Sequence, residues 1–533
     1  MKLSSFNDFV LAVDLGTSGC KCALVDQAGN VLAWAFRPVT LHFVDDVGAE
    51  QDPLEWWQAF LEAARELIAQ LPGSGGQVVA ICCSCQGECT VPVDRNGVPL
   101  HRALSWLDMR GARQIRRRAG NRFFSVFGYG PLKLARWISR TGGAPALSGK
   151  DPAAHMAFIQ EEYPNIYSRT SKFLNALDYM NLRLTGRFTA TVDSILTSWV
   201  TDNRDPGRIH YDRALIRQSG IDADKFPEIV SCTDRLGPLS PEAARELGLP
   251  EETPVIAGAV DNSAAGVGSG AVRDMDAHIY IGTSSWIGAH VPFKKTDIFS
   301  QIAAVPCAIP QRYMAIGLQS SAGSSLSFLK DRLLFPVDEL NTGIPEDPYF
   351  AIEQLAAAMP PGSHDLLYLP WLFGERTPVD DSTLRAGFLN LSLRHQRGDM
   401  IRAVLEGVAL NTRWMLEPFN QFLGSPIDKV TLVGGGATSN LWCQIFADVL
   451  KIPVLQPVAP VQTNAIGAAF LGFIGIGTLS FEQVPSITLI RQVYVPQPGS
   501  AAVYDELFAR FRLAHRQLRP FYHRINRSES VQR

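Results

Sequence analysis

The sequence lacks a long hydrophobic run and an excess of charge of either sign. No segment has the roughly 18 to 20 consecutive apolar residues that span a bilayer, and the run Phe9–Val13 is too short for the core of a signal peptide. A net charge of −3 over 533 residues gives no electrostatic reason to expect nucleic acid or an anionic membrane as a partner. These absences point away from a membrane-spanning or nucleic-acid-binding protein.

The sequence also lacks a paired set of metal-binding cysteines. Its nine cysteines are an odd number for a large chain, which favours reduced thiols and a cytoplasmic location. Cys82, Cys83, Cys85 and Cys89 cluster, and zinc is one interpretation of such a cluster. Successive residues of the predicted strand Val78–Cys85 point to opposite faces, however, and no CxxC pair accompanies them. We therefore favour small buried hydrophobic side chains over a zinc site.

The length and pattern predict two α/β domains, because 533 residues exceed what one core normally organises. Near the N-terminus, Phe9–Asp14, Lys21–Asp26 and Val31–Phe36 have the composition of strands. A helix follows, with Asp52 as its predicted N-cap and Pro53 at its first position, and the next predicted strand is Val78–Cys85. Strands that alternate with helices in this way indicate an α/β sheet domain.

The second half repeats part of this pattern. We expect Pro254–Val260 to be the strand that opens a second sheet unit. Asp14–Gly19 reads DLGTSG and Tyr280–Ser285 reads YIGTSS, and the two threonines of these turns are 266 positions apart, half the chain length. The repeat predicts two related domains that face each other, at residues 1–253 and 254–533.

Both turns have the chemistry of a phosphate-binding site. A hairpin of Gly, Thr and Ser offers backbone N–H groups and hydroxyls to phosphate oxygens without side-chain bulk. Only the first turn has a carboxylate, Asp14, which would hold Mg²⁺, and Lys21 follows within reach of a transferred phosphoryl group. An ordinary hairpin turn is the alternative for either copy alone. A P-loop is excluded at Gly149-Lys150, because Ala144 stands where its first glycine is needed.

Two further features fit a nucleotide and an acceptor hydroxyl. Gly434–Gly436 follows a predicted strand and precedes a predicted helix, which lets a nucleotide approach the backbone; a tight turn is the alternative. Asp261 ends an apolar strand and opens a run of small residues. There it would accept a proton from a substrate hydroxyl, or else cap the following helix.

A set of polar side chains on predicted loops suits a polyhydroxylated ligand. The set offers an amide, two carboxylates, an indole and a guanidinium, so that each hydroxyl finds both a donor and an acceptor. Salt bridging among the charged members is the alternative. The residues are Gln86, Glu88, Trp106, Asp108 and Arg110.

In this order and at these separations, the motifs resemble those of the FGGY carbohydrate kinases, particularly xylulokinase-like members. The likeness runs almost from end to end. The segments that carry it are Asp14–Lys21 (DLGTSGCK), Gly258–Gly270 (GAVDNSAAGVGSG), Tyr280–Ser285, Phe373–Asp381 (FGERTPVDD), Ala386–Ala409 and Val433–Leu450 (VGGGATSNLWCQIFADVL).

The resemblance implies two actin-like, ribonuclease H-like domains with an active-site cleft between them. It implies in-line transfer of the γ-phosphoryl group of ATP to a sugar hydroxyl, with Asp261 as the base and with Asp14 and Asp261 at the Mg²⁺ ion. The remaining residues are assigned to ATP. They are Thr17, Ser18, Lys21, Gly282 and Thr283 at the phosphates, and Gly434, Gly435, Gly436, Ala437 and Asn440 at the adenosine.

The segments that would face the sugar depart from the xylulokinase pattern. Gln86-Gly87-Glu88-Cys89 replaces the usual Gln-Met-His-Gly, and a glutamate at this place is more like glycerol or tetritol kinases. Thr141–Phe158 is also longer than usual, and its first part is expected to be a loop. We expect a kinase for a ketopentose such as xylulose, and a homodimer is one possible assembly. A glycerol or tetritol kinase, and an actin-like regulator that closes on ATP without transferring phosphate, are the alternatives.

Overall fold

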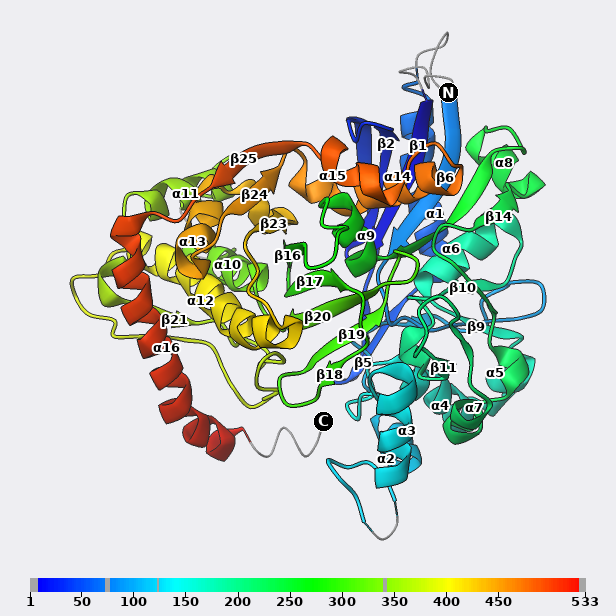
Figure 1. Cartoon of the computed structure of the whole chain (residues 1–533), viewed down its shortest axis with the longest axis horizontal. Helices are drawn as coiled ribbons and strands as arrows, with labels where there is room; N and C mark the ends of the chain where they lie inside the picture. Colours follow the sequence, from blue (N-terminus) through cyan, green and yellow to red (C-terminus); the bar gives the residue numbers. More distant parts are fainter. Residues whose placement is uncertain (1–7, 72–76, 122–123, 339–342, 527–533) are drawn as a thin grey trace.

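The computed structural model describes residues 8–71, 77–121, 124–338 and 343–526. Two β-sheets lie side by side in it, and each carries its own helices (Figure 1). The first sheet has six strands in the order β14-β15-β6-β1-β2-β3. Their bounds are β1 Asp8–Gly16, β2 Gly19–Asp26, β3 Val31–Pro38, β6 Gln77–Cys85, β14 Arg235–Pro238 and β15 Pro254–Val260.

The first sheet is built around a central hairpin. β1 pairs antiparallel with β2, β2 pairs antiparallel with β3, and β6 lies parallel to β1 on the other side. Helix α1 (Pro53–Ile68) covers one face, and the Asp52 side chain caps it by accepting a hydrogen bond from the N–H of Leu54, as the sequence predicts. Cys83 and Cys85 pack on the α1 side and Cys82 on the opposite side, where all are buried.

The second sheet has eight strands in the order β18-β19-β20-β17-β16-β23-β24-β25. Its central hairpin is antiparallel, and two parallel strands extend it on one side. The order β20-β17-β16-β23-β24 therefore repeats β3-β2-β1-β6-β15, which confirms two ribonuclease H-like units. The bounds are β16 Ala277–Ile281, β17 Ser285–Val291, β18 Thr296–Asp297, β19 Ile302–Pro306, β20 Tyr313–Gln319, β23 Val430–Val433, β24 Val454–Pro457 and β25 Ile490–Tyr494.

The place of β15 corrects one expectation. The sequence pattern predicts that Pro254–Val260 opens the second sheet unit, but this strand pairs in parallel with β6 and belongs to the first sheet. The second sheet begins with β16 at Ala277. The prediction is wrong because an apolar strand pattern does not reveal which neighbour a strand pairs with.

Smaller elements extend the N-terminal lobe. The segment between α3 and α4 is a loop over residues 142–151, as expected for the first part of the long stretch that begins at Thr141. The elements are β4 His42–Val44, β5 Gly48–Gln51, β7 Val91–Val93, β8 Ala103–Leu104, α2 Ala112–Ala119, α3 Pro131–Thr141, α4 Pro152–Glu162, α5 Pro164–Arg169, β9 Lys172–Leu174, α6 Ala176–Thr185, β10 Thr189–Thr191, β11 Thr201–Asp202, β12 His210–Tyr211, α7 Arg213–Ser219, β13 Glu228–Val230 and α8 Pro241–Leu247.

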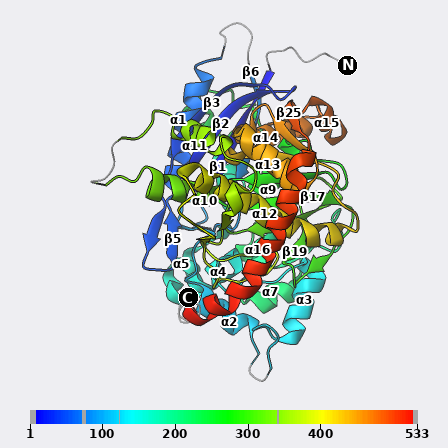
Figure 2. The same cartoon turned by 90° about the vertical axis from the view of Figure 1, so that its left-hand side faces the viewer.

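Long helices cover the second sheet. α12 (Arg397–Leu423) is buried along most of its length, and α16 (Pro498–Ile525) runs across the front of this lobe in Figure 2. None of the helices in the described ranges combines the length and apolar character of a membrane span. The other helices and short strands are α10 Gly323–Leu329, α11 Pro348–Ala357, β21 Leu367–Leu369, β22 Gly387–Leu389, α13 Asn440–Leu450 and α15 Val484–Ile487.

Two helices join the lobes through their backbones. α9 (Asp261–Gly268) follows β15, and α14 (Thr463–Gly475) follows β24, so the two helices hold equivalent places in the two units. A Cβ atom added to Gly268 would lie 2.0 Å from the carbonyl oxygen of Thr463, and one added to Gly467 would lie 1.9 Å from that of Ala264. Only glycine permits this approach, which packs a helix of the C-terminal half against the first sheet.

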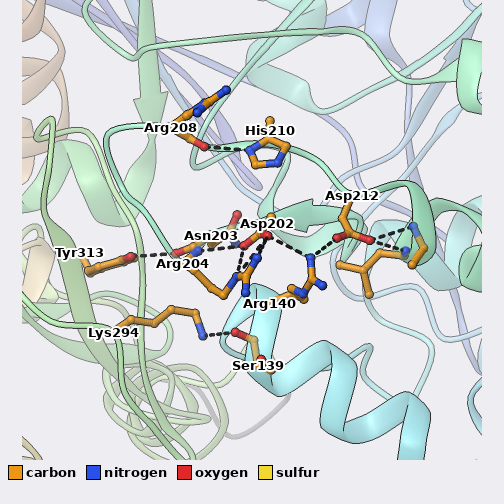
Figure 3. A network of polar contacts seen from close by, with 12 residues as sticks. Ser139, Arg140, Asp202, Asn203, Arg204, Arg208, His210, Asp212, Lys294 and Tyr313 are labelled. Carbon is orange, nitrogen blue, oxygen red and sulfur yellow. Dashed lines mark hydrogen bonds and ion pairs between the residues drawn. The ribbon is translucent and has the colours of Figure 1, made fainter.

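The lobes also meet through a polar contact (Figure 3). Lys294 donates hydrogen bonds of 3.0 Å to the carbonyl oxygens of Ile138 and Ser139 at the C-terminal end of α3. A cation at this helix end satisfies carbonyls that have no partner within the helix. Nearby, the Tyr313 hydroxyl donates to the carbonyl oxygen of Asn203 over 2.7 Å. The lobes are thus connected both at the α9–α14 crossing and at α3.

We predict that Gly467→Ala destabilises the protein by about 3 kcal/mol or more, because its Cβ would overlap a backbone atom that cannot move independently. Thermal or urea unfolding measures the effect. Gly499→Ala is the matched control, since it also lies in a helix but a Cβ added there has no described atom within 4 Å. Equal stability of the two variants would contradict the proposed backbone crossing.

Candidate active site

The first Gly-Thr-Ser turn places Asp14 at the junction of the two lobes. In the β1–β2 hairpin Asp14 lies opposite Lys21, and the Lys21 Nζ is 3.0 Å from the Asp14 Oδ2. Lys21 also donates to the carbonyl oxygen of Val461 over 3.2 Å, and Asn464 of α14 donates to the Asp14 Oδ1 over 3.4 Å. The C-terminal half of the chain therefore helps to orient Asp14, and Lys21 neutralises part of its charge.

The same turn is linked to two residues predicted to bind substrate. The Thr17 hydroxyl donates to the Gln86 Oε1 over 2.8 Å and accepts from the Trp106 indole N–H over 2.9 Å. The Gln86 amide donates in turn to Gln51, whose own amide donates to the Thr17 carbonyl oxygen. Gln86 is 3% exposed. Both ends of its amide are thus engaged in holding the turn, and the indole of Trp106 keeps only its ring faces for a ligand.

Glu88 is the accessible carboxylate of this loop. Its backbone has a φ of 60°, a left-handed conformation that is unusual outside glycine and asparagine. Burial raises the pKa of its carboxyl, while the positive charges of Arg376 and Lys150 lower that pKa in part. Arg376 comes from the second lobe and Lys150 from the loop between α3 and α4. Two lobes and the long loop therefore converge on Glu88.

Asp108 and Arg110 form an ion pair instead of a free polar surface. The Asp108 side chain is 0% exposed, and it accepts hydrogen bonds from the N–H of Ala49 and from the Arg110 guanidinium at 2.7–3.2 Å. Arg110 also pairs with Glu50 at 2.6 Å. Direct contact between Asp108 and a ligand is excluded in this arrangement because no surface of its carboxylate is accessible. The pair fixes the loop that carries Trp106.

Asp261 lies at the first position of α9. The helix cap is the preceding Val260, and the Asp261 Oδ1 accepts a hydrogen bond of 2.8 Å from the N–H of Asn262. Burial, together with the negative charges of Asp14 and Glu88, raises the pKa of Asp261 to about 7. A general base works best when its pKa is close to the working pH. The geometry thus supports a base more than a simple helix cap.

The second Gly-Thr-Ser turn faces these carboxylates from the other lobe. Burial and the charges of Asp14 and Asp261 raise the pKa of Tyr280, which stacks on Trp286 with ring centroids 4.0 Å apart. Gly282 is required beside this ring, because an added Cβ would lie 2.5 Å from it. The Thr283 side chain is exposed, and its carbonyl oxygen accepts from the N–H groups of Ala322 and Ser324 at the start of α10.

The glycine turn after β23 packs directly on the end of β16. Gly434 has a φ of 87°, and a Cβ added to it would lie 2.7 Å from the carbonyl oxygen of Ile281. A Cβ added to Gly435 would have no atom of the described ranges within 4 Å, so the backbone there is open to a ligand. Ala437 is buried, whereas Asn440 is exposed and its Oδ1 accepts from the Tyr494 hydroxyl over 2.9 Å. The side-chain NH₂ group of Asn440 takes no part in this hydrogen bond.

Several residues of this site were missed by the sequence analysis. Gln51 and Asn464 have no motif around them that marks an active site. Arg376 lies within the quoted segment Phe373–Asp381, and Lys150 within the long stretch after Thr141, but neither was assigned a role. Arg376 follows the buried Glu375, which accepts from the N–H of Ser320 and from the Asn411 amide.

The C-terminal helix fixes the loop that carries Arg376. Asp381, at the other end of this loop, exchanges two backbone hydrogen bonds with Glu375. The last turns of α16 contact the same Asp381 carboxylate through Arg519 at 3.2 Å and His523 at 2.7 Å. A helix far away in the sequence therefore determines where Arg376 stands.

The carboxylates fit a magnesium ion that arrives with a nucleotide. Mg²⁺ is commonly held by one or two carboxylates together with phosphate oxygens and water. Asp14 and Asp261 supply such oxygens. No group of three or more His, Cys, Asp or Glu side chains arranged for a metal occurs within the described ranges. This donor set suits a metal shared with bound phosphates.

Comparison with known proteins agrees with this arrangement. Residues 9–268 match the model of the N-terminal domain of the FGGY family of carbohydrate kinases, and residues 277–476 match that of its C-terminal domain. The xylulose kinase of Staphylococcus epidermidis is 28% identical over 96% of this chain and 97% of its own. The gluconokinase of Bacillus subtilis is 27% identical, with 97% of each chain covered. The crystal structure of the xylulose kinase of Rhodospirillum rubrum superimposes with a TM-score of 0.80 at 26% identity, over 97% of this chain and all of that one.

We predict that the stability gained through Asp261→Asn is larger at pH 8 than at pH 5. The pKa of Asp261 rises from 3.8 to about 7 on folding, so its contribution to stability is full below pH 4 and is lost as the pH rises through 7. Asparagine removes a charge that burial and the nearby Asp14 and Glu88 disfavour, which is worth at most about 4 kcal/mol. Calorimetric Tm values of both proteins at the two pH values test this. A Tm difference that is equal at both pH values, or smaller at pH 8, would contradict it.

Proposed function

The chain belongs to the FGGY family of carbohydrate kinases, and on this premise we propose that it transfers the γ-phosphoryl group of Mg-ATP to a hydroxyl of a small sugar, with Asp261 as the general base. The observation that carries this proposal is the place of Asp261 at the start of α9, between the two lobes, where burial and the nearby charges of Asp14 and Glu88 raise its pKa. A carboxylate whose pKa is raised toward neutral pH is suited to accept a proton from a hydroxyl.

Most of the predicted residues then have a physical role, whereas Asp108 and Arg110 hold the loop that carries Trp106. Asp261 takes the proton of the attacking hydroxyl, and Glu88 accepts a hydrogen bond from a neighbouring hydroxyl. Asp14 and Asp261 are the residues that would hold Mg²⁺, which neutralises phosphate charge when it is bound with ATP. The turns at Thr17-Ser18 and Gly282-Thr283 are the faces proposed for the phosphates, although the N–H of Gly282 itself donates to the carbonyl oxygen of Ser284. Gly434–Gly436, Ala437 and Asn440 form the face proposed for the adenosine.

A ketopentose such as xylulose is the substrate that we propose, because xylulose kinases are frequent among the similar proteins. Glycerol and tetritols stay the alternative at a site with Glu88. One observation favours a further class, the aldonates. Lys150 and Arg376 lie near Glu88, and a gluconokinase is about as similar to this chain as the xylulose kinases are. Two cations would pair with a sugar carboxylate.

The cellular setting of this activity is proposed from the chain itself. All nine cysteines are free and buried, which suits a reducing compartment, and we propose the cytoplasm. A homodimer is proposed as the assembly.

We predict that one class of acceptor raises ADP release from Mg-ATP well above the rate without acceptor. Ketopentoses, glycerol, tetritols and aldonates form the panel. Asp261→Asn should bind ATP and stay folded while its turnover falls by roughly 10²–10⁴, because asparagine cannot accept the proton. Coupled measurement of ADP gives the rate. A fully active Asp261→Asn enzyme would exclude Asp261 as the base.

We also predict that Arg376→Ala and Lys150→Ala distinguish the two sugar classes. For an aldonate, each change should raise the KM by about tenfold or more, since a charge-assisted hydrogen bond is worth roughly 1.5–3 kcal/mol. For a neutral ketose the KM should change little. Arg519→Ala is a useful companion, because it loosens the Arg376 loop without removing the guanidinium. Equal losses for both sugar classes would rule out a carboxylate-binding role.

A further inference from the structure

A buried carboxylate outside the predicted set holds the end of the strand that precedes Asp261. Asp193 lies just after β10 and is 5% exposed. Its Oδ2 accepts a hydrogen bond of 3.0 Å from the N–H of Val260, the last residue of β15. This contact spans 67 positions of the sequence. It fixes the backbone one residue before the proposed base, at the point where the strand turns into α9.

The other neighbours of Asp193 are also donors. The Thr191 hydroxyl donates to its Oδ1 over 2.6 Å, and the Cys232 thiol donates to the same oxygen over 3.3 Å. Burial raises the pKa of the Asp193 carboxyl, and these donors, together with the Ser263 hydroxyl two residues after Asp261, lower that pKa in part. An ionised carboxylate, which only accepts, matches such a set of donors.

A side-chain amide in place of the Asp193 carboxylate would match these donors less well. Asparagine has nearly the shape of aspartate, but one of its two ends is an NH₂ group that only donates. With its NH₂ toward Val260, the amide would set a donor against the N–H of that residue. With its NH₂ toward Thr191, the threonine hydroxyl would have to turn and accept, and its own proton would lose the acceptor that Asp193 provides. In either orientation one buried donor loses its acceptor, which costs roughly 1–3 kcal/mol and loosens the contacts that hold this junction.

We propose that Asp193 is a positioning residue for the phosphoryl-transfer reaction, which fixes the β15–α9 junction so that the Asp261 carboxylate points at the acceptor hydroxyl. The inference rests on the proposed role of Asp261. Asp193 itself touches neither substrate nor nucleotide. It acts through the N–H of Val260 from the loop after β10, and so connects the outer part of the N-terminal lobe with the reacting atoms. A displacement of about 1 Å in such a group lowers the rate by up to about 10²-fold.

The experiment measures kcat and KM of Asp193→Asn in the full-length enzyme, with rates divided by the number of ATP-binding sites counted by titration. This division removes any unfolded fraction from the comparison. We expect kcat to fall between about tenfold and a hundredfold while the KM values for ATP and sugar stay within about twofold. A wild-type kcat in the folded variant would overturn the proposal.

Thr191 supplies a milder and independent test. Thr191→Val removes the hydroxyl that orients Asp193, whereas Thr191→Ser retains it. We expect a lower kcat for the valine variant, a kcat close to wild type for the serine variant, and no further loss when Thr191→Val is added to Asp193→Asn. If Asp193→Asn does not fold, equal kcat values for the valine and serine variants overturn the proposal. If the double variant instead loses kcat by the product of the two single factors, the two residues act independently through a general structural effect, and this result would also overturn the proposal.

Two controls separate this inference from the proposed function. Asp212→Asn changes another buried carboxylate of the same lobe, which caps α7 by accepting from the N–H groups of Ala214 and Leu215 and, among the described residues, makes no hydrogen bond to β15 or α9. Its kcat per binding site should stay close to wild type. Asp261→Asn is measured in parallel. If it keeps full turnover, the proposed base is wrong; if it is inactive while Asp193→Asn is unimpaired, only the positioning role fails.

Discussion

The backbone contact between α9 and α14 is the constraint on which the rest of the site depends. Gly268 faces the carbonyl oxygen of Thr463, and Gly467 faces that of Ala264. The two contacts are equivalent, because Gly467 lies 199 positions after Gly268 and Thr463 lies 199 positions after Ala264. The crossing is thus a symmetric junction between the repeated units. It lets the start of α14 reach Asp14 while α9 carries Asp261.

The two units differ in the side chains that they place next to this junction. At the same offset of 199 positions, the residue equivalent to Asp261 is Pro460, so only the first unit carries a base at this place. The loop after β6 and the turn after β23 are also equivalent, yet one presents Glu88 and the other three glycines. We infer that the first unit is adapted to an acceptor hydroxyl and the second to a nucleotide. Burial, together with the negative charges of Asp14 and Glu88, raises the pKa of Asp261, and keeping an ionised carboxylate there lowers the stability of the folded chain.

Much of this fold could be predicted from the sequence, because the signals are local. The central hairpin with its turn at Thr17, the cap at Asp52 and the glycine turn at 434–436 each depend on residues close together in the chain. The partner of β15 could not be predicted, since strand pairing is a long-range property. The site residues also divide into those with a local sequence signal and those defined by long-range contacts. The position of Asp261 was predicted, whereas Asp193 has no local signal, because its role depends on a contact 67 positions away.

We propose that the two lobes direct the γ-phosphoryl group of ATP to a sugar hydroxyl. The most direct measurement is a single turnover with enzyme in excess over γ-labelled ATP, in the presence of each candidate sugar, followed by separation of sugar phosphate from inorganic phosphate. If the claim holds, the label moves almost entirely into the sugar phosphate with one sugar class. Label that stays in ATP, or that reaches only inorganic phosphate with every sugar, would contradict it.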